Sequence, residues 1–197
     1  MKGDDSFDSE QFSFSDNDSE NSQTKERTSN NEGNDEKEIK NIDLIKSITQ
    51  ILESILEDNK RLINYSQIIK KQSKMVFNSR IIPDISIEKY LIRIQNYTNL
   101  ERNSLIAGLI YIDRFCKISK IILTYNNIHK ILFTSIFLSI KFNEDLFYEN
   151  KYYAEIAGIK LNELIALEYH FVNLIQFLFY IKTETFKDYK KYLEEFI

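Results

Sequence analysis

Residues 131–140 read ILFTSIFLSI, ten positions without a charge that lie between Lys130 and Lys141. A membrane-spanning helix needs about 20 apolar residues, so this stretch is too short to cross a bilayer. A helix that is apolar on all sides is buried in the middle of a folded domain. The stretch therefore predicts a central core helix with other helices packed around it.

Helical spacing of apolar residues continues on both sides of this stretch. Apolar positions recur at steps of three and four, and no alternating strand pattern persists. Pro83 breaks the chain, and N-cap candidates precede four of the apolar runs; they are Ser86, Thr98, Thr124 and Asn150. The predicted helices cover about residues 43–58, 86–94, 98–117, 124–141, 150–158 (ending at Gly158), 161–174 and the end of the chain from 183, with a less regular one near 62–71. We therefore predict an all-α fold, with five short helices around the apolar helix and one flanking helix at each end.

The charge distribution divides the chain near residue 40. Residues 1–40 carry 12 acidic and 5 basic side chains, whereas residues 41–197 carry 18 acidic and 21 basic ones. The first part has few large apolar side chains, so it cannot bury enough surface to offset its chain entropy. We therefore predict a disordered acidic tail over residues 1–40.

Chemistry-bearing residues are too few for common catalytic or cofactor sites. The single cysteine, Cys116, excludes an internal disulfide framework, and two separated histidines, His129 and His170, do not form a zinc-site pattern. Four glycines are too few for a Gly-rich phosphate loop, and no nucleophile or kinase-loop motif is present. We therefore expect no enzyme activity, no cofactor, no metal and no small-molecule substrate.

Targeting and charge signals favour an intracellular protein that binds other proteins. The start of the chain has no apolar signal-peptide region, and no stretch is long enough to span a membrane. The net charge of +3 over residues 41–197 is weak for a nucleic-acid-binding domain, and the pairs 70–71 and 190–191 (both KK) are typical of solvated helix faces. We expect a cytoplasmic or nuclear protein without a membrane or nucleic-acid partner.

Residues 111–115 (YIDRF) resemble the second-helix motif of the cyclin box. Upstream, residues 83–87 (PDISI) and 90–94 (YLIRI) look like the entry to that box in P-type cyclins, the subfamily of the yeast phosphate-response cyclins and the plant U-type cyclins. Further matches follow in the family's order: 123–124 (LT), 127–129 (NIH), 141–142 (KF), 144–145 (ED), Asn150, Tyr152, Tyr153, Gly158, Glu163, 167–168 (LE) and Phe171. The resemblance implies a single cyclin box over residues 76–182, a helical segment over 41–75 and a C-terminal helix over 183–197.

The resemblance also implies a partner and a binding site. It implies a regulatory subunit that binds a cyclin-dependent protein kinase through the PSTAIRE-type helix of that kinase and activates it. In the family, a lysine at the end of the third box helix and a glutamate in the fifth contact this helix, and the matching residues are Lys141 and Glu168. These two side chains can also form a salt bridge with each other inside the bundle, and in the family both arrangements hold together.

Arg93, Asp113 and Arg114 are expected to have a structural role. The resemblance implies that Asp113 and Arg114 hold the box together, with Arg93 as the candidate ion-pair partner of Asp113. Residues 90–94 depart from the MRAIL sequence of the substrate-docking patch in larger cyclins, so we do not expect docking there.

Two other functions stay open: a helical adaptor for another protein, and a binding module similar to transcription factor IIB.

Overall fold

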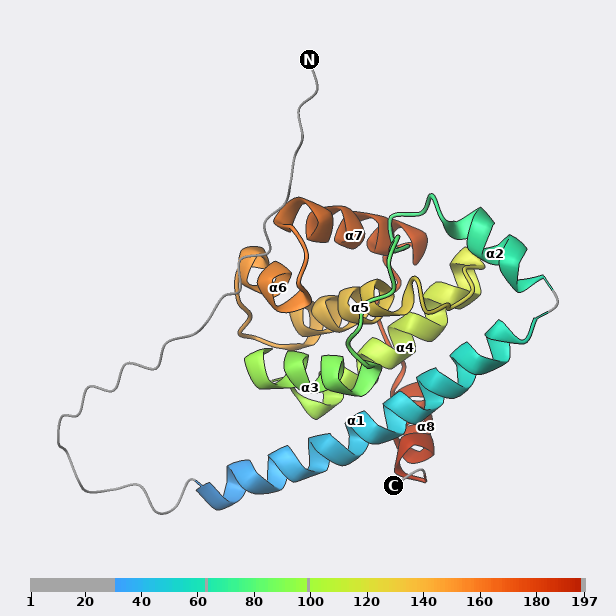
Figure 1. Cartoon of the computed structure of the whole chain (residues 1–197). Coiled ribbons are helices and arrows are strands. Elements are labelled where there is room, and N and C mark those ends of the chain that lie inside the picture. The colour runs from blue at the N-terminus through green and yellow to red at the C-terminus, as the bar shows by residue number, and fades with distance from the viewer. Residues whose placement is uncertain (1–30, 63, 99, 196–197) are drawn as a thin grey trace.

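The computed structural model describes residues 31–62, 64–98 and 100–195, and every regular element in these ranges is a helix. The helices are α1 (Asn31–Lys60), α2 (Tyr65–Gln72), α3 (Ile87–Thr98), α4 (Arg102–Ser119), α5 (Ile128–Asn143), α6 (Asn150–Ala157), α7 (Leu161–Leu174) and α8 (Thr183–Glu194). Helices α3 to α7 form a bundle, and α1 lies across α3 and α4 (Figure 1). The prediction of an all-α fold is confirmed.

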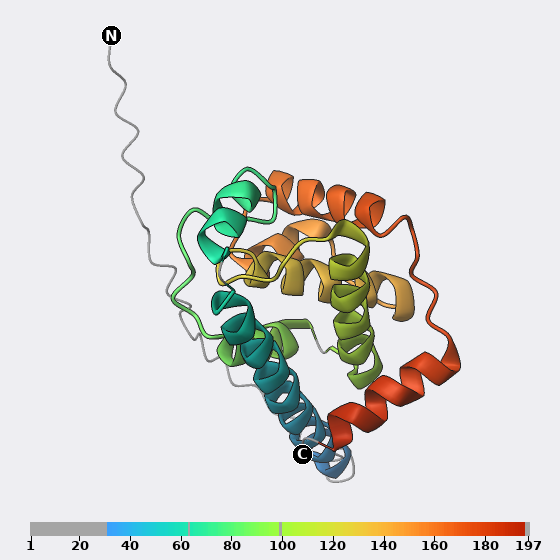
Figure 2. The ribbon, with the colours of Figure 1, turned by 90° about the vertical axis from the view of Figure 1, so that its right-hand side faces the viewer.

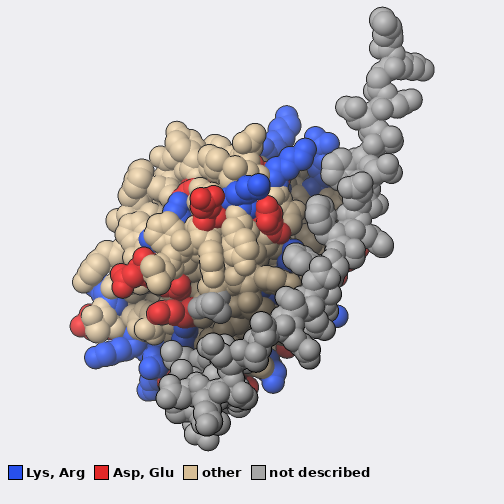
Figure 3. Space-filling model, turned by 90° about the vertical axis from the view of Figure 1, so that its left-hand side faces the viewer, with Lys and Arg blue, Asp and Glu red and all other residues tan. Residues whose placement is uncertain are grey.

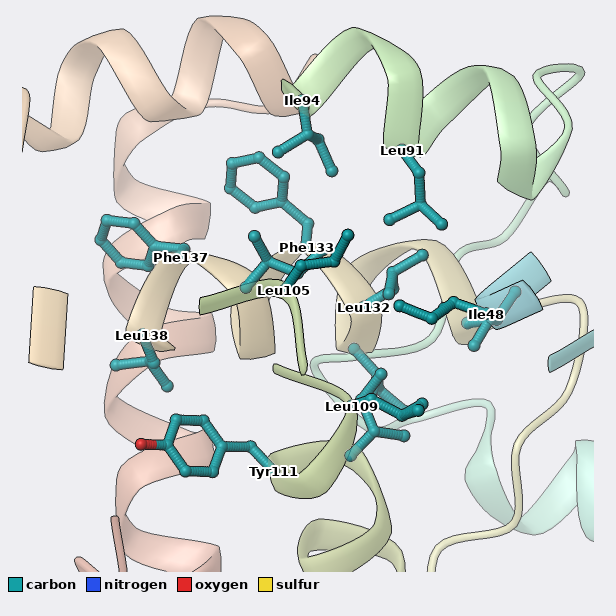
Figure 4. Close-up of a cluster of buried hydrophobic side chains, with 14 of the residues drawn as sticks. Ile48, Leu91, Ile94, Leu105, Leu109, Tyr111, Leu132, Phe133, Phe137 and Leu138 are labelled. Carbon is teal, nitrogen blue, oxygen red and sulfur yellow. The ribbon is translucent and has the colours of Figure 1, made fainter. Parts of the chain in front are cut away.

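Helix α5 is the centre of the bundle, as the uncharged stretch predicted. All its residues from Ile128 to Ile140 are buried except Lys130. The hydroxyls of Thr134, Ser135 and Ser139 donate to helix carbonyls at 2.7–2.8 Å, so these buried polar groups are satisfied within the helix. Figure 4 shows the apolar side chains of α5 meeting those of α3 and α4.

Close packing of α4 on α5 depends on Gly108. A Cβ atom at this position would lie 3.1 Å from Cγ1 of Ile136 and 3.4 Å from its Cα. The first distance is tighter than ordinary van der Waals contact and the second is at its lower limit, so the absence of a side chain lets the two helix backbones approach. The largest interface between helices in the described part of the chain is consequently that of α4 with α5.

Three phenylalanines from distant parts of the chain form a second buried cluster. Phe115 of α4 stacks on Phe171 of α7 with ring centroids 4.6 Å apart, and Phe77 meets Phe115 edge-on at 5.0 Å. Phe77 comes from the connection between α2 and α3, and all three side chains are almost completely buried. This cluster ties the connection before α3 to α4 and α7.

Helix α1 buries one face against the bundle and begins earlier than expected. Ile45, Ile48, Leu52 and Leu56 are buried, in agreement with the predicted apolar spacing. The helix starts at Asn31 rather than near residue 43, so residues 31–40 of the expected tail are helical, because extending an existing helix costs less than starting one. Residues 1–30, the rest of that tail, lie outside the described residues.

Two of the predicted helix boundaries are confirmed by the local geometry. The Ser86 hydroxyl oxygen accepts a hydrogen bond from the Lys89 N–H at 3.3 Å, as an N-cap does. Gly158 ends α6 with φ +70°, a left-handed conformation that costs glycine little.

Three other N-cap predictions are wrong. Thr98 belongs to the end of α3, where its hydroxyl donates to the Ile94 carbonyl at 2.7 Å, and α4 starts only at Arg102. Threonine hydroxyls bond a carbonyl four residues back as readily as they cap a helix, so sequence alone did not distinguish the two roles. Thr124 precedes a turn, and Asn127 occupies the N-cap of α5. Asn150 is already inside α6, and Glu149 occupies its N-cap.

Helix α8 does not join the bundle of α3 to α7. It packs against α4 and α1, and a connection without regular structure leads to it from the end of α7 (Figure 2). The Tyr189 hydroxyl donates to Oδ2 of Asp113 at 2.7 Å, which anchors α8 on α4. Leu193 is the fully buried apolar contact of this helix.

Candidate functional site: a charged pair in an apolar surface

Lys141 and Glu168 form an ion pair across two neighbouring helices. Lys141 lies in the last turn of α5 and Glu168 lies in α7, and Nζ of the lysine is 2.6 Å from Oε1 of the glutamate. The side chains are 25% and 21% exposed, so the pair is half-buried but open to solvent. The expected salt bridge inside the bundle is therefore formed.

Neighbouring groups hold both charges in place. The Asn150 side-chain amide donates to Oε2 of Glu168 at 3.5 Å, so both carboxylate oxygens have a partner. Nζ of Lys141 lies 4.9 Å from the ring centroid of Phe137, within the range of a cation–π interaction. A cation in the last turn of a helix is also favoured by the helix dipole. The Lys141 ammonium has three N–H donors, and Glu168 accepts from one of them.

Several large apolar side chains that are near Lys141 or Glu168 in sequence are exposed to solvent. They lie at the end of α5, in the connection from α5 to α6, and on α7 on either side of Glu168; they are Phe142, Leu146, Phe147, Tyr148, Ile165 and Tyr169. Leu146 is 89% exposed and Tyr169 is 65% exposed. Contiguous apolar groups on a protein surface are typical of sites that bind other proteins.

Charged side chains of one sign do not cluster on the described surface around the end of α5. Seen from the side on which α6 lies, uncharged surface predominates, and basic and acidic side chains are interspersed in it (Figure 3). This mixture fits a protein partner better than a phosphate backbone, which attracts clusters of cations.

Sequence analysis missed the role of Asn150 in this site. We predicted Asn150 as an N-cap, but its amide supports Glu168. The two tyrosines that follow have different positions: Tyr153 is buried in the core, and the hydroxyl of the more exposed Tyr152 donates to the Tyr97 carbonyl at 3.0 Å. The sequence indicated these residues only through their order along the chain, which matched the family pattern. Their contacts could not be predicted, because they depend on how α6 packs on its neighbours.

The expected ion pair of Arg93 with Asp113 is not formed. The Arg93 guanidinium donates to the Glu155 carbonyl at 3.3 Å, near the end of α6. Asp113 instead pairs with Lys117 one turn later, Nζ to Oδ2 at 2.7 Å, and accepts the hydrogen bond from Tyr189. Lys117 and Tyr189 are thus the partners of Asp113, in place of Arg93 of α3.

Arg114 has a structural role of a different kind from an ion pair. Its guanidinium donates to the backbone carbonyls of Leu178 and Tyr180, the second at 3.2 Å, in the connection between α7 and α8. The Tyr111 hydroxyl donates to the carbonyl of Phe179 between them at 3.0 Å. Tyr111 and Arg114 therefore hold this connection to α4.

Two groups that catalyse reactions in other proteins, the Cys116 thiol and the His129 imidazole, are here partly buried and buried, respectively. Burial raises the pKa of the Cys116 thiol to about 12, and the nearby Asp113 carboxylate adds to the effect, so the thiol stays protonated at neutral pH. His129 is buried, its Nε2 lies 2.9 Å from the Ile85 carbonyl oxygen, and burial lowers its pKa. Within the described ranges, no three His, Cys, Asp or Glu side chains gather as a metal site, and no helix is long and apolar enough to cross a membrane.

Comparison with known proteins identifies the family. The family model described as Cyclin matches residues 11–179 of the chain. The chain belongs to the cyclin family. Its relatives include Cyclin-U2-1 of Arabidopsis thaliana, 32% identical over 77% of this cyclin and 68% of the relative, and Cyclin-U4-1 of the same plant, 32% identical over 77% and 75%. PHO85 cyclin-7 of Saccharomyces cerevisiae is 28% identical over 78% of this cyclin and 61% of the yeast protein.

The relatives bear on the predicted subfamily and on the extent of the match. U-type cyclins, a P-type cyclin of rice and the yeast PHO85 cyclin all resemble the chain, which confirms the sequence-based resemblance. This cyclin spans 68% of the length of Cyclin-U2-1 and 52% of the length of Cyclin-U2-2. The matched part includes the helices that carry Lys141 and Glu168.

Proposed function

We propose that this cyclin is a regulatory subunit that binds a cyclin-dependent protein kinase and activates it by holding its PSTAIRE-type helix. Family membership supports a regulatory rather than a catalytic role. The observation that carries the proposal is the Lys141–Glu168 ion pair, which is partly exposed and has exposed apolar side chains near it in sequence and along α7. A helix with one apolar face and charged groups at its margin is complementary to such a surface.

The apolar surface would supply most of the binding free energy. Moving a kinase from 1% to 99% active requires about 5.5 kcal/mol of differential binding. At ~25 cal/mol per Å², about 220 Å² of apolar surface buried only in the active arrangement supplies that amount, before the cost of association. Six large exposed side chains at the end of α5, in the connection from α5 to α6 and on α7 are open to such burial.

Lys141 and Glu168 would set the orientation of the kinase helix. The ammonium of Lys141 has donors left for a partner carboxylate or a helix carbonyl, and Glu168 can accept from a partner cation. Charged pairs of this kind contribute more to orientation and partner choice than to affinity. Holding the helix inward aligns the catalytic Lys–Glu ion pair of the kinase and shifts its population towards the active state.

The test separates an internal salt bridge from a contact with the kinase. Kinases captured by this cyclin from its native lysate are identified, expressed and purified, and their affinity and phosphotransfer rate are measured with purified cyclin. The variants are Lys141→Glu, Glu168→Lys and the double swap, which restores opposite charges inside the bundle but reverses them towards a partner. Lys187→Glu makes the same change of charge at an exposed lysine of α8, outside the two helices that carry the ion pair.

The proposal predicts that only the site variants lose the kinase. Each single variant should bind at least about tenfold more weakly, since an unpaired charge at an interface costs about 2 kcal/mol or more. The double swap should fold like wild type but still bind weakly, and Lys187→Glu should match wild type. Wild-type affinity of the double swap would refute the charge contact, binding without stimulation would indicate an adaptor, and failure to capture any kinase would refute the function.

A further inference from the structure

Residues 59–83 form a strongly basic part of the chain that the small net charge conceals. This stretch holds six basic side chains and no acidic one; they are Lys60, Arg61, Lys70, Lys71, Lys74 and Arg80. It includes α2 and the connections on both sides of it, and all six side chains are exposed. Helix α8 provides a contrast, because acidic residues are interspersed among its lysines.

Hydrogen bonds attach this stretch to the connection between α4 and α5. The Gln72 side chain exchanges two bonds with the backbone of Ile122, at 3.0 and 2.9 Å, and the Asn59 amide donates to the Leu123 carbonyl at 3.0 Å. The connection between α4 and α5 lies beside α2 (Figure 1), and Lys120 belongs to this connection, two residues before Ile122.

Five cations at this end lack an ion-pair partner within the described part of the chain. Lys60 and Arg61 pair with Glu57 and Asp58 of α1. The unpaired five, which we call the basic face, are Lys70, Lys71, Lys74, Arg80 and Lys120. Unneutralised cations on one face attract an anionic ligand, and the attraction weakens as salt rises.

Apolar side chains are exposed in the same stretch. Leu62, Met75, Ile81 and Ile82 all reach solvent, and Ile81 is 83% exposed. A ligand for this end of the molecule would therefore combine acidic groups with large apolar ones, since both kinds of surface are open there.

One segment of this cyclin has that chemistry. Residues 4–20 carry seven acidic side chains and no basic one, and they include Phe7, Phe12 and Phe14. The segment lies before α1, outside the described residues. Its charge is opposite to that of the basic face, and its phenylalanines match the exposed apolar groups.

The chain is long enough for this segment to reach the basic face. Helix α1 has 30 residues and is about 45 Å long at 1.5 Å per residue. Its last turn leads directly to the α2 stretch. Phe12 lies about 19 residues before Asn31, and an extended chain of that length spans about 60 Å. A relaxed chain of about 19 residues spans about 24 Å, so docking must extend the chain. The tether nevertheless gives the segment a fixed effective concentration at the basic face, which does not depend on the protein concentration.

We propose that residues 4–14, the part of the segment that the chain can bring across the length of α1, dock on the basic face of the same molecule. The basic face lies where α5 begins, whereas Lys141 and Glu168 lie where α5 ends, so the docked segment leaves the ion pair open. The proposal does not depend on the kinase partner.

The test places a nitroxide on the segment of the full chain and measures paramagnetic broadening of backbone amides by NMR. The label is attached to Ser9→Cys in a chain that also carries Cys116→Ala, so that only one thiol is present. Spectra are recorded at about 0.01 M and about 1 M salt, where the Debye length falls from about 30 to about 3 Å. One variant carries Lys70→Glu, Lys71→Glu and Lys74→Glu, and the matched control carries Lys187→Glu, Lys190→Glu and Lys191→Glu.

Docking predicts a several-fold loss of amide intensity across α2 and residues 117–123 at low salt. The loss should disappear at high salt and in the α2 variant, but remain in the α8 control. A chain with Asp4→Asn, Asp5→Asn, Asp8→Asn and Glu10→Gln, which leaves the described helices untouched, should also lose it. No broadening at α2, equal broadening in both lysine variants, or broadening seen only between mixed labelled and unlabelled molecules would overturn docking within one molecule.

Discussion

Replacing Arg114 with alanine should release the connection between α7 and α8. The guanidinium donates to two carbonyls of this connection, and the Tyr111 hydroxyl donates to the carbonyl between them. Just before these carbonyls, Gln176 and Phe177 have φ values of 56° and 59°. A left-handed conformation costs a residue with a side chain about 1–2 kcal/mol, so the hydrogen bonds to α4 must offset this strain.

The size of the effect follows from the number of bonds and their exposure. A hydrogen bond from a charged donor contributes about 1.5–3 kcal/mol, so two of them set an upper limit of about 6 kcal/mol. Arg114 is partly open to water, which replaces much of the lost bonding. We therefore expect Arg114→Ala to lower the free energy of unfolding by about 2 kcal/mol, a fall in Tm of about 4–8 °C for a domain of this size.

Thermal unfolding followed by far-UV circular dichroism measures the loss, and hydrogen exchange locates it. Exchange should accelerate at the amides of Leu178 and Phe179, which bond within the connection. Arg114→Lys keeps the charge but not the planar fork, so it should lose about half as much. Lys187→Ala should change stability by less than about 0.5 kcal/mol. If Arg114→Ala is no less stable than this control, or exchange in the connection is unchanged, the reasoning is refuted.

Three further predictions test the core, a helix end and a buried histidine. Phe115→Ala should lower the free energy of unfolding by about 3–5 kcal/mol and Phe115→Leu by far less, since the ring is buried between Phe77 and Phe171; urea denaturation measures both. Gly158→Ala should lower the free energy of unfolding by about 1 kcal/mol, the strain of a left-handed residue, because nothing lies within 4 Å of the added Cβ. Thermal unfolding measures this change, and a larger loss would mean that the methyl group meets a contact absent from the structure. Burial lowers the pKa of His129 below its usual 6.5, so the unfolded chain binds a proton that the folded chain rejects. Stability should therefore fall as the pH drops below about 6.5, and less so in His129→Gln; equal urea midpoint shifts in the two proteins between about pH 7.5 and pH 5.5 would contradict this.

Much of the fold was predictable because helices are encoded locally. The buried centre at residues 131–140, the apolar face of α1 and the end of α6 at Gly158 follow from apolar spacing or from one residue's conformational preference. The wrong N-caps at Thr98 and Thr124 have the opposite cause. The Thr98 hydroxyl bonds to the Ile94 carbonyl within α3, and at Thr124 the backbone N–H donates to the Asn127 side chain, so the surrounding structure decides which polar groups cap a helix.

The site was predictable only where the family resemblance supplied the pairing. Nothing in the spacing of Lys141 and Glu168, 27 residues apart, places them side by side, and the packing of α5 against α7 does so. The support from Asn150 and the surrounding apolar surface also require the fold. For Asp113, the resemblance suggested Arg93, whereas the position of α8 supplied Tyr189.

The sequence by itself therefore determined the helical class, the central helix and the acidic and basic segments, since each depends on the composition and period of a short stretch. Only the tertiary structure decided which polar groups meet: Asp113 with Tyr189, 76 residues away, and Arg114 with carbonyls 64 and 66 residues away. The physical reason is that burying apolar surface tolerates many partners, whereas a hydrogen bond requires one partner at about 3 Å. That distance is set by the packing of whole helices.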